Sequence, residues 1–401
     1  AHAIGIFGDG GVGGSGGGIC SELSCEQPDA IIGTLSKSLG SYGGFVAGPA
    51  KLREFLINCA RSFIYSTALP PAVLGAIDAA LDLLPSLEAV AVDASAGNFE
   101  TMRTLAPPTA RGWEAVSCDE VWDWTAELAE LPSLLAEKVK APSVVAGPTD
   151  LVIDPTNLWL TIHESIGHAT EYDRAIGYEA AYAGTSFATP DKLGTMRYGS
   201  PVMNVTADRT VEHGLATIGF DDEGVAAQSW DLVRDGMFVG YQLDRVFAPR
   251  LGEPRSNGCS YADSAHHVPI QRMANVSLQP SADDVSTDDL IARVSDGIYI
   301  VGDKSWSIDM QRYNFQFTGQ RFFRIRDGRL DGQLRDVAYQ ATTTDFWGAL
   351  EAVGGPSTWR LGGAFNCGKA QPGQVAAVSH GCPSALFRGI NVLNTREESG
   401  R

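Results

Sequence analysis

The spacing of apolar residues changes along the chain and separates two kinds of predicted structure. Beyond Thr185 apolar and polar residues alternate, which is typical of strands with one buried face. An amphipathic helix precedes this region at residues 122–138 and is expected to break or restart at Pro132. Two predicted strand pairs are joined by a dipeptide that favours tight hairpins, namely Asp235-Gly236 and Asp327-Gly328. Residues 121–401 are therefore predicted to form an α+β domain that is mainly antiparallel sheet.

The front of the chain follows a different, α/β pattern. Residues 1–90 read as short strands and helices around a Gly-rich loop, Gly8 to Gly18. The start of that loop formally matches GxGxxG, but further glycines follow it instead of a helix, so we do not interpret it as a dinucleotide site. Residues 91–120 lose their periodicity and are rich in Ala, Ser, Asp, Pro and Gly, which predicts a junction between the two parts.

One predicted helix carries most of the candidate chemistry. Asp154 is a suitable N-cap, Pro155 suits the first helical position, and an apolar stripe faces the core at Leu158, Ile162, Ile166 and Ala169. His163 and His168 are five residues apart, which on a regular helix separates their directions by about 140°. The two imidazoles can share a metal ion only if the helix is distorted. Gly167 is where we expect a π-bulge or a break.

Composition narrows the classes of function. The net charge of −18 repels phosphate backbones, so nucleic acid is not expected to be a direct partner. No apolar run of about 18 residues could span a membrane, and the first residues lack the features of a signal peptide. Seven cysteines, with no CxxC pair, suit a reducing compartment. These observations favour a cytoplasmic protein.

A cysteine far along the chain supports the interpretation of the histidine pair as part of a metal site. Cys367 is followed by glycine in Asn366-Cys367-Gly368, and a thiolate is a soft donor suited to zinc. Two imidazoles and one thiolate would leave a fourth zinc position for water, which is the catalytic pattern. Cys367 as a nucleophile with His163 or His168 as its base is the alternative, but it leaves Glu164 without a role. A second local pair, His380 and Cys382, is interpreted as structural and near a turn.

Four segments of the second half resemble the TldD subgroup of the TldD/PmbA metallopeptidases: the HESIGHATE stretch at 163–171, residues 184–214, residues 221–224 and the NCGKAQPGQ loop at 366–374. The resemblance runs from about residue 112 to the end. It implies that His163, His168 and Cys367 bind zinc and that Glu164 is the general base. It also implies a substrate that is an extended or unfolded peptide, and either a PmbA/TldE-like partner subunit or a homodimer. The family's own first domain is mostly replaced by the front fragment.

The front fragment, about residues 1–88, resembles the α-oxoamine synthases such as 8-amino-7-oxononanoate synthase, which have pyridoxal phosphate (PLP) fold type I. The resemblance rests on the Lys37 turn, the Tyr65-to-Pro71 stretch and the opening Ala-His-Ala. It implies that Lys37 forms the Schiff base, that His2 lies near the cofactor ring, and that Thr34 and Thr67 contact the phosphate. The family's aspartate that pairs with the pyridine nitrogen would lie before Ala1. We therefore expect a vestigial PLP site, and a PLP-dependent acyltransferase or a non-catalytic fusion remnant remain the alternative functions.

Overall fold

The chain divides into two compact units, residues Ala1–Ala89 and Val90–Arg401. The structure, a computed structural model, describes residues 31–34, 44–47, 88–93, 95, 97–112, 114–117, 121–369 and 373–398. In the first unit these residues form one antiparallel pair, β1 (Ile31–Thr34) and β2 (Gly44–Ala47). Thr34 ends β1, whereas His2, Lys37 and Thr67 lie outside the described residues. The proposed vestigial PLP site therefore stays a prediction.

The main sheet of the second unit has seven strands, and all but one of its pairings are antiparallel. Its strands are β5 (Gly147–Ile153), β12 (Asp296–Ile308), β13 (Asn314–Arg326), β14 (Arg329–Gln333), β15 (Val337–Thr342), β16 (Leu350–Val353) and β19 (Ala385–Asn394). The order is β12-β5-β19-β15-β13-β14, and β16 pairs with β19. Because β12 also pairs with β13, the pairings of β12, β5, β19, β15 and β13 close into a ring. Only β5 and β12 run parallel to each other.

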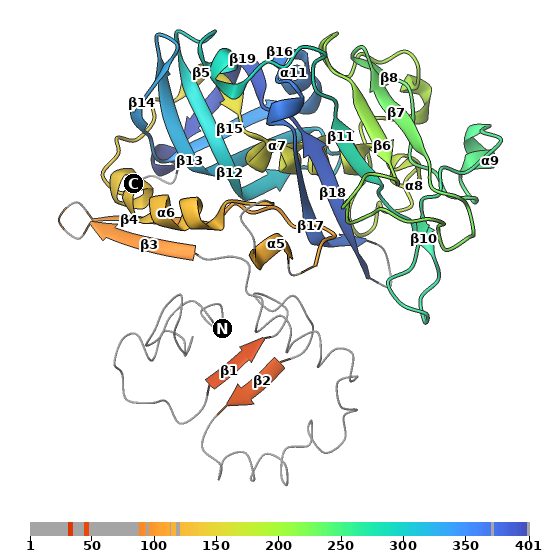
Figure 1. The fold of residues 1–401 in the computed structure, drawn as a ribbon. Helices are drawn as coiled ribbons and strands as arrows, with labels where there is room; N and C mark the ends of the chain where they lie inside the picture. Colours follow the sequence, from red (N-terminus) through yellow and green to blue (C-terminus); the bar gives the residue numbers. More distant parts are fainter. Residues whose placement is uncertain are drawn as a thin grey trace. The chain divides into compact units, whose positions relative to one another are not determined.

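Smaller sheets complete the second unit (Figure 1). One has the order β11-β6-β7-β8, with strands Asn275–Leu278, Val205–Asp208, Ser229–Arg234 and Met237–Phe238. The others are two-stranded: β17 (Arg360–Lys369) with β18 (Gln374–Cys382), β9 (Ser260–Tyr261) with β10 (Ile270–Gln271), and β3 (Glu88–Asp93) with β4 (Asn98–Arg103). The predicted α+β class with mainly antiparallel sheet is confirmed. Strand β4 lies within residues 91–120, the stretch predicted as a junction.

Helix α7 (Pro155–Ile162) lies at the centre of the second unit and packs against β12, β17, β18 and β11. The other helices are α5 (Glu114–Ser117), α6 (Trp124–Lys138), α8 (Tyr172–Ala175), α9 (Ala248–Leu251), α10 (Thr287–Ile291), α11 (Thr343–Gly348) and α12 (Thr395–Glu398). Four shorter helical turns are His163–Gly167, His168–Thr170, Pro190–Lys192 and Pro356–Thr358. No helix of the described residues is long and apolar enough to cross a membrane.

Two local predictions have different outcomes. Both Asp-Gly hairpins are confirmed: Asp235 and Gly236 have φ values of 50° and 76°, and Asp327 and Gly328 have 48° and 74°. Positive φ at both central residues matches the right-handed twist of the flanking strands. The predicted break at Pro132 is wrong, because α6 runs through it. Leu131 and Leu135 are both buried and hold the two halves of α6 in one helix.

Candidate metal centre

The helix that carries the histidine pair is distorted between the two histidines. Asp154 caps α7 by accepting a hydrogen bond from the Thr156 N–H at 2.9 Å, as its sequence position predicts. At His163 the helix changes to a π-helical turn, His163–Gly167, in which the His168 N–H donates to the carbonyl of His163. This i to i+5 bond joins the two histidines themselves, and it brings their ring centroids to 4.6 Å. The predicted defect near Gly167 is confirmed.

Gly167 lies in a tightly packed place and has an ordinary backbone angle. Its φ is −52°, which any residue adopts, but a Cβ at this position would lie 2.5 Å from Sδ of Met273. Its carbonyl accepts a hydrogen bond from Nε2 of Gln242 at 2.7 Å. That bond satisfies a carbonyl at the distorted end of the helix, where regular helical partners are lost. The π-helical turn is therefore supported by the core around it.

His163 is oriented by a third histidine, which the sequence analysis interpreted as structural and near a turn. His380 lies in β18, two residues before the strand ends at Cys382, and its Nε2 is 2.7 Å from Nδ1 of His163. Nδ1 of His380 is 2.9 Å from the carbonyl of Val276, which can only accept a hydrogen bond. We infer that His380 donates from Nδ1 to that carbonyl and accepts from His163 at Nε2. The lone pair of Nε2 on His163 is then free to bind a metal.

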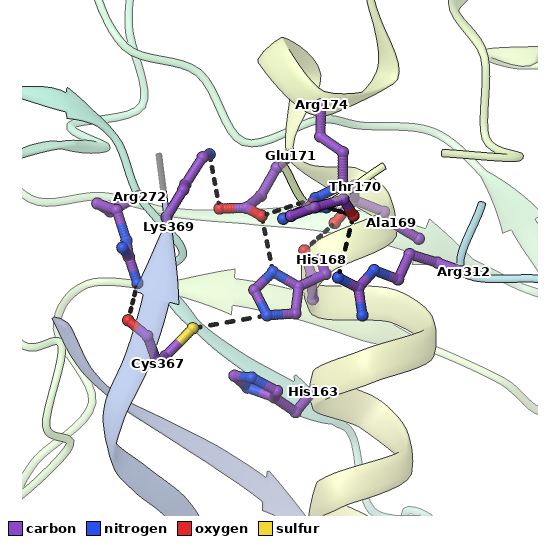
Figure 2. Close-up of polar contacts among 12 residues, drawn as sticks. His163, His168, Ala169, Thr170, Glu171, Arg174, Arg272, Arg312, Cys367 and Lys369 are labelled. Carbon is purple, nitrogen blue, oxygen red and sulfur yellow. Dashed lines mark hydrogen bonds and ion pairs between the residues drawn. The ribbon is translucent and has the colours of Figure 1, made fainter. Parts of the chain in front are cut away.

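His168 is oriented in the same way by a carboxylate. Nδ1 of His168 donates to Oε2 of Glu171 at 2.8 Å, which leaves the lone pair on Nε2 free. This Nε2 lies 3.5 Å from Sγ of Cys367, and Figure 2 shows His168 between Glu171 and Cys367 with His163 beside it. This role of Glu171 was not predicted from the sequence. The spacing of three residues, which places the two side chains on one helix face, was the signal that could have found it.

A bulge in β17 turns Cys367 toward the helix. The pairing of β17 with β18 shifts between Ala364 and Cys367, and the two intervening residues, 365 and 366, are both exposed. Beyond the bulge the alternation resumes, so that Cys367 and Lys369 are buried on the same face. Cys367 then meets His168, and Lys369 meets Glu171 at 2.9 Å. The two-residue spacing along β17 therefore places Cys367 beside His168 and Lys369 beside Glu171.

Glu171 is held by a buried set of charges. Nζ of Lys369 lies 2.9 Å from Oε1 of Glu171 and 2.9 Å from Oδ1 of Asp173, and Arg174 donates from Nε to Glu171 at 3.4 Å. Burial alone would raise the pKa of Glu171, but the Lys369 ammonium and His168 hold it well below its usual range. Burial raises the pKa of Asp173 to about 6. Glu171 thus stays a carboxylate that accepts from His168.

The remaining predicted site residue, Glu164, lies next to His163 in the π-helical turn. It is buried, and its Oε2 accepts a hydrogen bond from Nη1 of Arg312 at 2.6 Å. Burial raises the pKa of this carboxyl, with Arg312 acting in the opposite direction. Among the described residues, the cluster of metal-donor atoms contains His163, His168 and Cys367 but not Glu164. Glu164 is a buried carboxylate outside the donor set.

The donor chemistry fits a zinc-class ion. The three donor atoms lie within 4.8 Å of one another, and ligands bound at about 2.0–2.3 Å around zinc are roughly 3–4 Å apart. Burial lowers the pKa of His163 well below its usual value and that of His168 to about 3, so both imidazoles are neutral near pH 7. Burial raises the pKa of the Cys367 thiol to about 11. A cation at this point would supply the charge that a buried thiolate needs.

The inferred hydrogen-bond chain predicts how zinc affinity depends on His380. His380→Leu removes the acceptor for His163 Nδ1–H, so His163 can adopt the other tautomer and lose its free Nε2. We expect zinc affinity to fall by about 10- to 100-fold, the usual effect of losing a hydrogen-bond partner of a ligand. His380→Gln keeps an acceptor oxygen and should retain more affinity than His380→Leu. Competition with a chromogenic chelator measures both, and equal affinity in His380→Leu and the parent would contradict the inferred tautomers.

Two families match different parts of the chain. The family described as PmbA/TldA metallopeptidase C-terminal domain matches residues 146–394, which include all three candidate donors and Glu164. The family described as aminotransferase class I and II matches residues 1–106. A putative 8-amino-7-oxononanoate synthase of Desulfosudis oleivorans is 50% identical over 90 residues, which are 22% of this chain and 21% of that protein. Both resemblances found in the sequence are thereby confirmed.

A metalloprotease of Methanothermobacter thermautotrophicus is 32% identical over 274 residues, which cover 67% of this chain and 56% of that protein. Among solved structures, TldE from Thermococcus kodakarensis superposes with a TM-score of 0.57 at 17% identity, covering 77% of this chain and 62% of that one. At that identity the likeness is one of fold. The chain spans about half the length of the curated metalloproteases it matches.

Proposed function

Because the chain belongs to the PmbA/TldA metallopeptidase family, we propose that it is a zinc-dependent peptidase that cleaves extended or unfolded peptides. The observation that carries the proposal is the convergence of two imidazoles and one thiol at a buried point. His163 and His168 each use Nδ1 for an internal hydrogen bond, which leaves Nε2 of each ring available as a metal donor. Two nitrogen donors and one sulfur donor suit zinc and leave a coordination position for water.

A bound zinc ion would polarise the scissile carbonyl and lower the pKa of water. The chain's own part of the chemistry falls to Glu164. This carboxylate adjoins a ligand without belonging to the donor set, so it can accept a proton from the attacking water and return it to the leaving amine. Its burial raises its pKa toward the working pH, which favours both transfers. Its Oε2 accepts a hydrogen bond from Nη1 of Arg312 at 2.6 Å.

The alternative of Cys367 as a nucleophile has less support. A nucleophilic thiol requires a lowered pKa or a base that takes its proton. Burial instead raises the pKa of Cys367 to about 11, and it lowers the pKa of His168, whose Nε2 lies 3.5 Å from the thiol, to about 3, which makes this imidazole a weak base. A ligand role uses the same geometry and leaves a function for Glu164. A PLP-dependent acyltransferase has no support from the described residues of the front unit.

The proposal extends to partners and compartment. We propose a PmbA/TldE-like subunit or a second copy of the chain as its partner, because the chain shares its fold with TldE from Thermococcus kodakarensis. A reducing, cytoplasmic compartment suits the three cysteines of the described residues, Cys259, Cys367 and Cys382, which are all free thiols. Cys367 must stay reduced to bind a metal.

Metal analysis of the purified chain tests the proposal directly. We expect one zinc ion per chain by elemental analysis, and loss of cleavage of an unstructured peptide after the metal is removed with a chelator. Added zinc should restore cleavage, whereas added magnesium should not, since magnesium prefers oxygen donors. A chain that cleaves the peptide equally well without bound metal would overturn the proposal.

A further inference from the structure

Arg312 belongs to a turn near the metal centre that is held by many hydrogen bonds. It lies in residues 309–313, the tip of the hairpin formed by the 13-residue strands β12 and β13. Within this tip Oδ1 of Asp309 accepts hydrogen bonds from the N–H groups of Gln311 and Tyr313 at 3.0 and 2.8 Å. Oδ2 of Asp309 accepts from the side chain of Asn314 at 2.8 Å. One carboxylate therefore closes the tip from inside.

Neighbouring segments hold the same tip from outside. Thr343 donates from Oγ1 to the carbonyl of Arg312 at 2.8 Å and from its N–H to that of Tyr313 at 2.7 Å. On the other side, the N–H groups of Thr185 and Phe187 donate to the carbonyls of Met310 and Gln311 at 2.7 and 2.8 Å. These bonds hold the backbone around Arg312 independently of the contacts that its side chain makes.

The backbone of Arg312 adopts an unfavourable conformation. Its φ is 62°, the left-handed region that a long side chain rarely adopts. Strain of this kind persists only where the surroundings impose it, and it is concentrated at functional sites. The two flanking residues, Gln311 and Tyr313, line a cavity of about 610 Å³. The Arg312 side chain turns instead toward the metal centre, and Figure 2 shows it on the side of His168 opposite Cys367.

The guanidinium of Arg312 contacts Glu164 and one backbone carbonyl. Nη1 lies 2.6 Å from Oε2 of Glu164, and Nη2 lies 3.4 Å from the carbonyl of Ala183. Arg174 donates to the same carbonyl at 2.7 Å and to Glu171 at 3.4 Å. Each glutamate of the centre is thus paired with its own arginine, and the two arginines are tied together by one backbone oxygen.

We propose that Arg312 is a positioning residue that holds the Glu164 carboxylate in its reactive orientation, a role that rests on the proposed peptidase function. Two donors of one planar group fix both the place and the angle of the ion pair, which a lysine cannot do. The hydrogen bonds of the hairpin tip hold the backbone of Arg312, and so keep its guanidinium in place beside Glu164. Arg312 acts through Glu164 and does not hold the metal.

Arg312→Gln and Arg312→Lys test this role in the full chain. We expect Arg312→Gln to lower kcat for an unstructured peptide at least tenfold, with KM within threefold of the parent and zinc content unchanged. Arg312→Lys should recover part of the lost kcat, because it restores the charge without the planar pair of donor nitrogens. Arg324→Gln is the matched control: Arg324 lies on β13 in a half-exposed ion pair with Asp296, and its replacement should leave kcat unchanged.

Glu164→Gln provides the coupling test. If Arg312 acts through Glu164, Arg312→Gln should lower kcat no further in a Glu164→Gln background. A full kcat in Arg312→Gln, loss of zinc, or independent multiplication of the two effects would overturn the proposal. Thermal unfolding of the parent, the two single variants and the double variant gives a readout that does not depend on activity. Arg312→Gln should lower Tm, and the double variant should recover most of that loss. A parent that binds no zinc and cleaves no peptide would refute the proposed function, while the unfolding cycle still decides whether Arg312 holds Glu164.

Discussion

Replacing Glu164 with glutamine is expected to lower kcat by about 100- to 10,000-fold, the usual contribution of a positioned general base. The amide has nearly the shape of the carboxylate, so it can remain beside Arg312 and fill the same buried space. It cannot accept a proton from water. Because Glu164 lies outside the cluster of donor atoms, zinc content should stay at one ion per chain.

Two measurements separate this result from a loss of folding or of metal. Zinc content and Tm are determined on the same preparation that is assayed for peptide cleavage. Glu130→Gln serves as the control, because Glu130 is an exposed carboxylate on α6 and its replacement should not change kcat. A Glu164→Gln variant that cleaves as fast as the parent would show that another group takes the proton. A variant that loses zinc would instead show that Glu164 supports the metal.

The helix distortion could be predicted because it follows from local spacing. Two histidines five residues apart diverge on a regular helix, so a shared metal ion requires one additional residue in the turn. The structure has that turn at His163–Gly167. The neighbour that packs against Gly167 could not be predicted, since Met273 is far from it in the chain and meets it only through tertiary packing.

The residues that orient the histidines were harder to predict. His380 is 217 positions from His163 and reaches it only because β18 packs on α7. No local pattern in the sequence specifies such a contact. Lys369 had a weak signal, because its spacing of two from Cys367 places both on one face of a strand. The bulge at residues 365–366, which sets that face, leaves no comparable mark in the sequence.

The Pro132 prediction was wrong for a related reason. A proline inside a helix removes one hydrogen bond and disfavours the preceding turn, which is a local cost. Packing of Leu131 and Leu135 into the core opposes that cost, and it depends on the rest of the second unit. Local rules therefore predicted α7 and the two hairpins, whose structure is determined by residues close in sequence. They failed at Pro132, where packing against distant segments determines the structure.

Cys367→Ala is expected to remove both zinc and peptide cleavage. Loss of a ligand of a zinc-class ion removes metal affinity itself, and we expect a fall of at least about 100-fold, the upper range found for ligand-supporting residues. The two histidines remain oriented by His380 and Glu171, so a weak two-nitrogen site should persist. Cobalt substitution should show a sulfur-to-metal charge-transfer band in the parent and none in Cys367→Ala.

Proton release gives an independent measure of the same ligand. Because burial raises the pKa of Cys367 to about 11, the thiol is protonated near pH 7 and must lose its proton to bind zinc. Both ligand histidines are already neutral there, His168 with a pKa of about 3. Zinc binding between pH 6 and 8 should therefore release about one proton from Cys367, and affinity should rise with pH. Cys367→Ala should lose this pH dependence.

Cys382→Ala is the matched control for this prediction. Cys382 is also a free and buried thiol, it lies on the paired strand β18, and its Sγ contacts the carbonyl of Pro155 rather than a histidine. Its removal leaves a small cavity, so Tm should fall while zinc content, proton release and kcat remain those of the parent. If Cys367→Ala binds zinc as tightly as Cys382→Ala and releases the same proton, the thiol is not a ligand. The donor set would then have to be rebuilt around another group near His163 and His168.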